Sequence, residues 1–159
     1  MANYDALAIA NEFITRNGGT MPQMKLQKLV YISNGWNLAI NREPLVRDRF
    51  EAWDGGPVVR KLWNHIRDFG YETASGLLTK RGTSTPVKAE LEEHERAVID
   101  HVWKRYCDYS GLELSEMTHE PGTPWSNAYY GSGRNAVLPQ TDIQQHFVEL
   151  ALAGRAQTA

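Results

Sequence analysis

The sequence contains little that would mark a secreted, membrane-bound or metal-binding protein. It has one cysteine, Cys107, among 159 residues, and a single cysteine can form neither an internal disulfide nor a zinc site. No stretch approaches the ~18 apolar residues that a membrane span requires, and the N-terminus lacks the basic and apolar regions of a secretory signal. We therefore expect a cytoplasmic protein that folds without disulfides, metals or cofactors.

An excess of positive charge is also absent. The chain has 17 Lys and Arg against 19 Asp and Glu, which gives a formal net charge of −2. Proteins that bind duplex DNA need clustered positive charge to contact the phosphates, so this balance argues against direct nucleic-acid binding. Five basic residues interleaved with aromatic ones could form such a face, but a solvated helix surface is the favoured interpretation: Lys25, Lys28, Arg60, Lys61 and Arg67.

Apolar residues recur at helical spacing along most of the chain. This pattern and the length predict a mainly α, compact single-domain helical fold with at most a small β-hairpin. The domain is expected to span residues 1–154, followed by a frayed tail at 155–159. The predicted helices cover residues 6–17, 22–40, 57–69, 91–106, 111–118, 124–130 and 142–153.

Local signals set several of these boundaries. Gly56-Pro57 is interpreted as a helix start, because proline is tolerated at the first helical position. Gly35 lies within the second helix, where glycine costs about 1 kcal/mol relative to alanine, so we expect another element to approach it closely. Four residues are predicted to cap helices through their side-chain oxygens: Asn3, Ser110, Thr123 and Thr141.

Two segments lack helical period. Residues 45–53 have a broken alternation that is compatible with a short strand or an extended loop. Residues 71–86 are rich in Gly, Ser and Thr and are expected to form a surface loop. Within that loop residues 77–80 are a candidate strand, which could form a β-hairpin with the region of Phe50.

No arrangement of residues typical of catalysis or metal binding is found. The five histidines form no zincin-type pair, and His94 and His101, seven residues apart on one predicted helix, lie about 10 Å apart along its axis. The segment 131–136 matches a dinucleotide-binding pattern, but it follows a predicted helix rather than a strand and is interpreted as a loop. We expect neither an enzyme nor a metal site.

The five tryptophans are more than a core of this size needs. Most are expected to pack in the core. Trp63 and Trp103 each lie one position away from the predicted apolar stripe of their helix. Since tryptophan often anchors protein interfaces, these two are the first candidates for exposed anchors of a partner.

Two blocks of this sequence occur together in a known family. Residues 24–36 read MKLQKLVYISNGW and residues 50–59 read FEAWDGGPVV, and Thr118-His119 and Pro124-Trp125 follow later in the chain. In this order, from about residue 6 to residue 147, they resemble the Panacea domain family, also called SocA-like antitoxins or phage-associated proteins. The first block is highly specific.

The resemblance implies a non-enzymatic, mostly helical antitoxin that neutralises a protein toxin, encoded beside it, by direct contact. The family pairs one domain with toxins of unrelated types, so the resemblance does not name the toxin. The signature positions of the family, most of which are expected to be fold determinants, fall here on Lys25, Leu26, Gln27, Lys28, Leu29, Tyr31, Gly35, Trp36, Trp53, Gly56, Pro57, Val58, Thr118, His119, Pro124 and Trp125.

We predict that Lys25 and Lys28 on the outer side of the second helix, with Tyr31, Trp53 and Trp63 nearby, form part of the toxin-binding face, because charged and aromatic residues cluster there without an evident role in the core. Two alternatives remain open. The chain could be an adaptor that delivers a bound toxin to a cellular protease, or another phage-associated regulatory binding protein. It could also be a small enzyme that uses His119 near Trp125.

Overall fold

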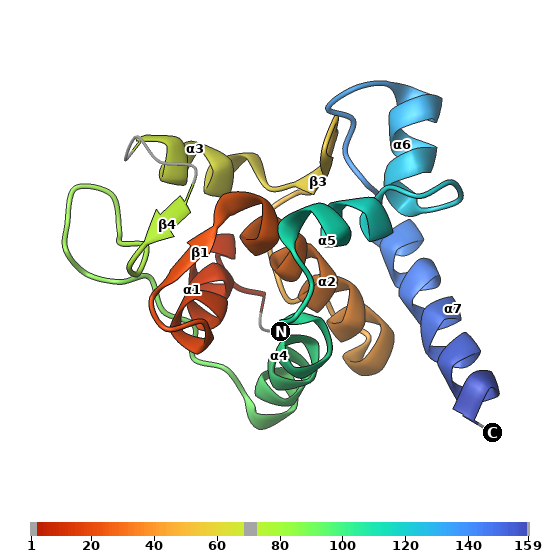
Figure 1. The fold of residues 1–159 in the computed structure, drawn as a ribbon, viewed down its shortest axis with the longest axis horizontal. Helices are drawn as coiled ribbons and strands as arrows, with labels where there is room; N and C mark the ends of the chain where they lie inside the picture. Colours follow the sequence, from red (N-terminus) through yellow and green to blue (C-terminus); the bar gives the residue numbers. More distant parts are fainter. Residues whose placement is uncertain (1–2, 69–72, 159) are drawn as a thin grey trace.

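Helix α2 (Gln23–Asn41) runs through the centre of the protein (Figure 1). The computed structural model describes residues 3–68 and 73–158. Helix α2 contacts α3 (Arg60–Asp68) and, more extensively, the four helices that surround it: α1 (Ala6–Arg16), α4 (Glu93–Tyr106), α5 (Gly111–Thr118) and α7 (Gln140–Thr158). Every residue from Leu26 to Leu38 is buried. The predicted mainly α fold is confirmed, and α2 has no solvent-exposed face over this segment.

Two pairs of short antiparallel strands and two further helices complete the described fold. Strand β1 (Thr20–Pro22) pairs with β4 (Thr73–Ser75), and β2 (Glu51–Trp53) pairs with β3 (Gly56–Val58). Helix α3 (Arg60–Asp68) follows the β2–β3 hairpin, and α6 (Pro124–Ser132) contacts β2. Backbone hydrogen bonds also join residues 135–138 to the β2 region, which therefore has neighbours on both edges.

The prediction that Gly56-Pro57 begins a helix is wrong. These residues lie in β3, with Pro57 opposite Ala52 and Gly56 opposite Trp53, and the helix begins only at Arg60. Proline has no N–H to donate in either environment, so its presence alone does not distinguish a helix start from a hairpin strand. Asp54 and Gly55 form the two-residue turn of the hairpin, and Gly56, which follows them, has a φ of +116° that favours glycine.

The predicted pairing of residues 77–80 with the Phe50 region is also wrong. Thr79 instead forms an isolated antiparallel bridge with Pro86, and Leu78 packs into the core. The buried Asn11 side chain binds both sides of this loop, since its amide donates to the Leu78 and Val87 carbonyls at 2.8 Å each and its oxygen accepts from the Leu78 N–H at 2.7 Å. A side chain far away in sequence therefore organises this loop.

Two of the four predicted helix caps are confirmed. The Ser110 hydroxyl accepts a hydrogen bond from the Glu113 N–H at the start of α5, and the Thr123 hydroxyl accepts one from the Ser126 N–H at the start of α6. The prediction for Asn3 is wrong, because Asp5 caps α1 by accepting from the Leu7 N–H at 2.9 Å.

The limits of α7 differ from the prediction at both ends. The helix begins at Gln140, one residue before the expected cap Thr141, and it continues to Thr158 instead of ending before Gly154. Because glycine lowers helix stability without preventing a helix, Gly154 was an unreliable stop signal.

Gly35 marks the closest approach of α7 to α2. A Cβ added at Gly35 would overlap the ring of Phe147. The Phe147 ring packs edge-on against Tyr31 and Trp36, with centroid distances of 5.9 and 5.4 Å. The expectation that another element approaches this glycine is confirmed.

Replacing Gly35 by alanine should therefore destabilise the protein, although alanine is the better helix former. The new methyl group forces the Phe147 ring out of its site, and overpacking of this kind typically costs about 1–3 kcal/mol. Urea unfolding of the G35A variant measures the loss. The matched control is Gly131→Ala, because a Cβ there meets no atom within 4 Å; equal stability of the two variants would contradict the packing argument.

Candidate functional site

The hairpin β2–β3 and the start of α2 border a groove of about 570 Å³, which we call the hairpin groove. Trp53 and Trp63 lie in it with ring centroids 5.5 Å apart, and Met24 is 44% exposed. The residues that line the groove are Pro22, Gln23, Met24, Gln27, Lys28, Trp53, Asp54, Gly55, Val58, Trp63, Arg134 and Asn135.

Gln27 attaches the hairpin to α2 by two hydrogen bonds. Its side-chain oxygen accepts from the Val59 N–H at 2.9 Å, and its amide donates to the Val59 carbonyl at 3.2 Å. Both residues are buried. Buried backbone groups need partners inside the protein, and Gln27 supplies both for a residue that lies between β3 and α3.

Lys28 makes the next contact between α2 and the hairpin. Its Nζ donates to the Pro57 carbonyl at 3.0 Å, and its side chain is only 2% exposed. Gly56, which has a φ of +116°, lies against this side chain, since a Cβ added there would be 2.9 Å from Lys28 Cε. Burial disfavours the charged ammonium and lowers the pKa of Lys28 to about 7.

Helices α5 and α6 hold the hairpin from the other side. The Ser115 hydroxyl donates to the Gly55 carbonyl, and the Trp125 indole N–H donates to the Trp53 carbonyl at 2.6 Å. The His119 ring packs against Trp125 with centroids 5.2 Å apart. Residues of three helices, α2, α5 and α6, therefore hold the hairpin in place.

The remaining signature positions belong to the core or to helix ends. Leu26 and Leu29 are fully buried. The Trp36 indole N–H donates to the Tyr106 hydroxyl at 3.1 Å. The Thr118 hydroxyl donates to the Leu114 carbonyl at 2.9 Å. Pro124 occupies the first turn of α6.

The predicted toxin-binding residues do not form one surface. Lys28, Trp53 and Trp63 all line the hairpin groove. Lys25 lies elsewhere, because its Nζ donates to the Cys107 carbonyl at 2.5 Å and is 6.0 Å from the centroid of the Trp103 ring.

The outer placement predicted for Lys28 is wrong, and so is the prediction that Tyr31 has no role in the core. Tyr31 is buried against Phe50 and Phe147, and burial raises the pKa of its hydroxyl. The prediction from apolar periodicity assumes that one face of α2 is exposed to solvent. The hairpin covers the side of α2 that carries Gln27 and Lys28, so these polar residues are buried as well.

Trp63 and Trp103, the first candidates for exposed anchors, are both half-buried. Arg67 lies over the Trp63 ring, with its guanidinium carbon 4.9 Å from the centroid. Trp103 packs near Phe13, with ring centroids 6.4 Å apart, at the margin of the core. Of the two, Trp63 is the one that lies in the hairpin groove.

Sequence reasoning missed Met24, Asp54 and Arg134 as residues of the groove. The Asp54 carboxylate accepts from Tyr129 at 2.8 Å and from Arg134 at 2.5 Å, and these contacts hold the pKa of Asp54 below its usual value. Tyr129 and Arg134 follow Asp54 by 75 and 80 positions in the sequence. No local pattern could have indicated this contact.

Neither a metal site nor a membrane span is found in the parts of the chain that the structure describes. Over residues 3–68 and 73–158, no three His, Cys, Asp or Glu side chains are grouped so that they could hold a metal ion. In the same ranges no helix combines the length and the apolar character needed to cross a membrane.

Replacing Lys28 by methionine should remove one component of the pH dependence of stability. Above pH 7 the folded protein keeps Lys28 largely neutral, whereas the unfolded chain protonates it up to its ordinary pKa of 10.5. Unfolding therefore takes up a proton, and the free energy of unfolding rises with pH by at most about 1.4 kcal/mol per unit.

Urea unfolding at pH 7, 8 and 9 measures this dependence. The wild-type protein should gain about 1–3 kcal/mol relative to the K28M variant between pH 7 and 9. An exposed-lysine control, Lys104→Met, should follow the wild-type slope. Parallel curves for the wild type and K28M would show that Lys28 is not held neutral.

Comparison with known proteins gives one family and one curated relative. A family model described as "Antitoxin SocA-like, Panacea domain" matches residues 26–126. The chain is 27% identical over 141 residues to a protein of Caulobacter vibrioides (strain NA1000 / CB15N) named "Antitoxin SocA", and the likeness covers 84% of this chain and 75% of the relative. No solved structure matches the chain. The matched segment includes α2 from Leu26 onward, the β2–β3 hairpin and α5.

Proposed function

Because the chain belongs to the Antitoxin SocA-like, Panacea domain family, we propose that it is an antitoxin that neutralises a cognate protein toxin by direct contact. The family match over residues 26–126 is the observation that carries this proposal. The toxin is a cytoplasmic protein encoded by an adjacent gene. The chain acts on it by binding and not by catalysis.

The hairpin groove is the part of the surface best suited to hold the toxin. It presents an exposed methionine and two half-buried tryptophans, and the ion pair of Asp54 with Arg134 borders them. Aromatic residues and methionine are enriched in protein interfaces, and polar residues typically form the rim. Groove residues Met24 and Trp63 are therefore the proposed contacts of the toxin.

The signature side chains act indirectly in this proposal. Gln27, Lys28 and Trp125 each bind a backbone group of the hairpin or of the residue that follows it. They fix the positions of the residues that touch the toxin. This division explains how one domain could keep its signature while its exposed residues differ between toxins.

Co-expression with the product of the adjacent gene tests the function. The toxin alone should arrest growth, and the antitoxin should restore it and co-purify with the toxin. Restoration of growth without a stable complex would contradict neutralisation by direct binding. If restoration also required a cellular protease, the chain would be an adaptor that delivers the toxin for degradation.

The variant Met24→Glu tests the groove as the toxin-binding surface. Burying a carboxylate against an apolar partner surface is costly, so toxin binding should weaken at least about tenfold, with a matching loss of growth rescue. Calorimetric titration of purified toxin measures the change. Because Met24 is 44% exposed, the variant should keep its circular dichroism and its stability.

The control for Met24→Glu is Leu152→Glu. Leu152 is 56% exposed on α7, outside the groove, so the substitution makes the same change of charge on a different surface. L152E should bind the toxin as the wild type does. Unchanged binding by M24E, or equal losses in both variants, would show that the toxin does not dock in the groove.

A further inference from the structure

A second hollow in the surface carries a concentration of positive charge. It has a volume of about 780 Å³ and lies between α3, the N-terminal segment and the loop that follows β4. Six of the chain's 17 Lys and Arg residues line it, but among the lining residues the one carboxylate is Asp5. The six cations that define this basic cleft are Arg47, Arg60, Lys61, Lys80, Arg81 and Lys88.

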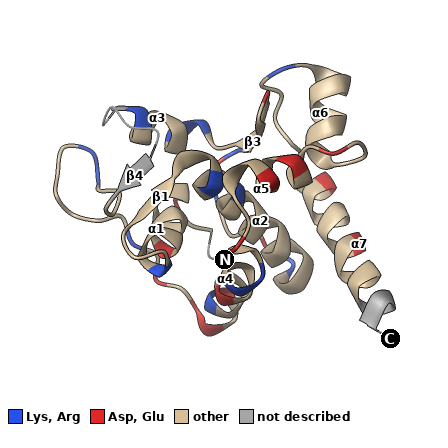
Figure 2. Cartoon of the chain, in the orientation of Figure 1, with Lys and Arg blue, Asp and Glu red and all other residues tan. Residues whose placement is uncertain are grey.

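The charge in the basic cleft contrasts with the chain as a whole, whose formal net charge is −2. Figure 2 shows basic segments on α3 and on the loop beyond β4, on the same side of the fold. Cations in a concave site with low-dielectric walls reinforce one another's field and concentrate anions. Grouping so many cations without a ligand is unfavourable, because like charges repel.

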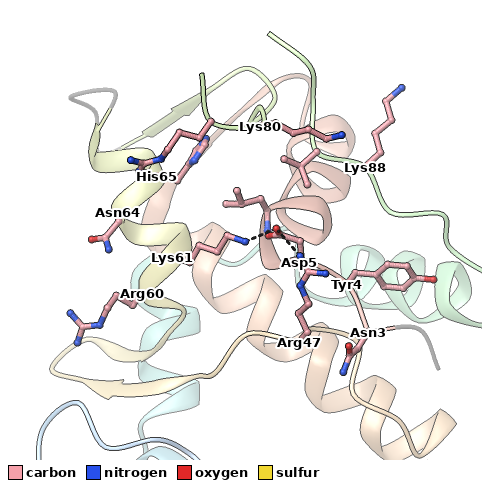
Figure 3. A pocket seen from close by; sticks show the side chains of 13 residues that line it. Asn3, Tyr4, Asp5, Arg47, Arg60, Lys61, Asn64, His65, Lys80 and Lys88 are labelled. Carbon is pink, nitrogen blue, oxygen red and sulfur yellow. Dashed lines mark hydrogen bonds and ion pairs between the residues drawn. The ribbon is translucent and has the colours of Figure 1, made fainter. Parts of the chain in front are cut away.

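Asp5 organises the cleft without neutralising it. Figure 3 shows Lys61 and Arg47 converging on this carboxylate, at 2.5 and 3.3 Å. Burial raises the pKa of Asp5, but the hydrogen bonds from Lys61 and the Leu7 N–H outweigh it and hold that pKa below its usual value. Asp5 therefore stays ionised and balances one of its two cations.

Lys80 and Lys88 have no ion pair among the residues that the structure describes. Both are exposed and line the cleft; in Figure 3 Lys80 lies on the opposite side of Asp5 from Arg47, and Lys88 extends away from Asp5. Arg60, on another part of the wall, is paired with Glu51 at 2.8 Å. Positive charge from Lys80, Lys88 and the Asp5 group therefore remains available to a ligand.

We propose that the basic cleft binds a small ligand that carries two or more phosphate groups. Its volume lies within the range of small-molecule sites, about 300–1,000 Å³. Arginine and lysine together provide the forked and point-like donors that bind phosphate oxygens. Cations that surround a centre from separate segments suit a compact polyanion, whose charge is as concentrated as theirs.

Nucleic acid fits this cleft less well. Single-stranded nucleic acid is bound by stacking bases on aromatic side chains. Among the lining residues Tyr4 is the one phenylalanine, tyrosine or tryptophan. Its hydroxyl donates to the Glu95 carboxylate at 2.6 Å. An acidic protein segment has a lower density of charge than a phosphate chain. The phosphate groups of a nucleotide and of a free oligophosphate share the chemistry that the cleft would recognise.

Calorimetric titration of the full chain with inorganic tripolyphosphate, ATP and adenosine tests the proposal at about 0.1 M salt, where electrostatic contacts beyond about 10 Å are screened. Tripolyphosphate and ATP should both bind with 1:1 stoichiometry, and adenosine should not. Equal affinities would assign recognition to the phosphates alone, and tighter binding of ATP would assign the ligand to the nucleotides. No saturable binding of either phosphate compound would overturn the proposal.

Variants locate the binding. The double substitution Lys80→Gln/Lys88→Gln should weaken tripolyphosphate binding about tenfold or more, since it removes two charged donors. The matched control, Arg96→Gln/Lys104→Gln, makes the same change of net charge on the exposed side of α4, outside the cleft. Equal weakening by both variants would show that the net charge of the protein, and not the cleft, holds the anion. Tighter binding of a poly-glutamate peptide than of tripolyphosphate would also overturn the proposal.

Discussion

Most polar side chains on α2 find hydrogen-bond partners inside the protein, because the helix is buried on all sides between Leu26 and Leu38. A buried polar group without a partner costs about 1–3 kcal/mol. Gln27 and Lys28 meet this constraint by binding the backbone of the β2–β3 hairpin and the residue after it. Asn34 does the same for the Leu45 and Val46 N–H groups. The central helix thereby organises the irregular chain segments packed around it.

The hairpin groove depends on this arrangement. It is lined by Trp53 and Val58 of the hairpin and by Gln27 and Lys28 of α2. Trp125 and Ser115 bind the hairpin from the opposite side. Signature residues therefore build the groove, whereas Met24 and Trp63, which lie outside the signature, are the contacts proposed for a partner. An antitoxin of this kind would recognise its toxin through residues that the signature does not include.

Sequence periodicity was sufficient for most helices, because their apolar faces and caps are local features. Ser110 and Thr123 were correctly recognised as caps for this reason. The hairpin was missed at Gly56-Pro57, since a proline there is compatible with a helix start as well as with a strand. The burial of Lys28 was missed because a helical stripe cannot show that a second face is covered by a distant segment.

The basic cleft and the hairpin groove are both lined by residues of α3. No local pattern predicted the basic cleft, since its cations come from positions as far apart as Arg47 and Lys88. Arg60 belongs to the wall of the cleft, and its guanidinium carbon also lies 5.2 Å from the centroid of the Trp53 ring in the groove. The two surfaces are therefore neighbours, and a ligand in one would lie close to a residue of the other.

If side chains of α2 hold the hairpin in place, the amide hydrogen exchange of Val59, the residue after β3, depends on Gln27. The Val59 N–H donates to the Gln27 side chain and is buried, so it should exchange slowly in the wild-type protein. In the Gln27→Ala variant it should exchange at least about tenfold faster, because loss of a hydrogen bond of about 1.4 kcal/mol changes the opening equilibrium tenfold. The amide of Val102 in α4 should exchange at an unchanged rate. Rapid exchange of Val59 in the wild type, or equal protection in both proteins, would contradict this dependence.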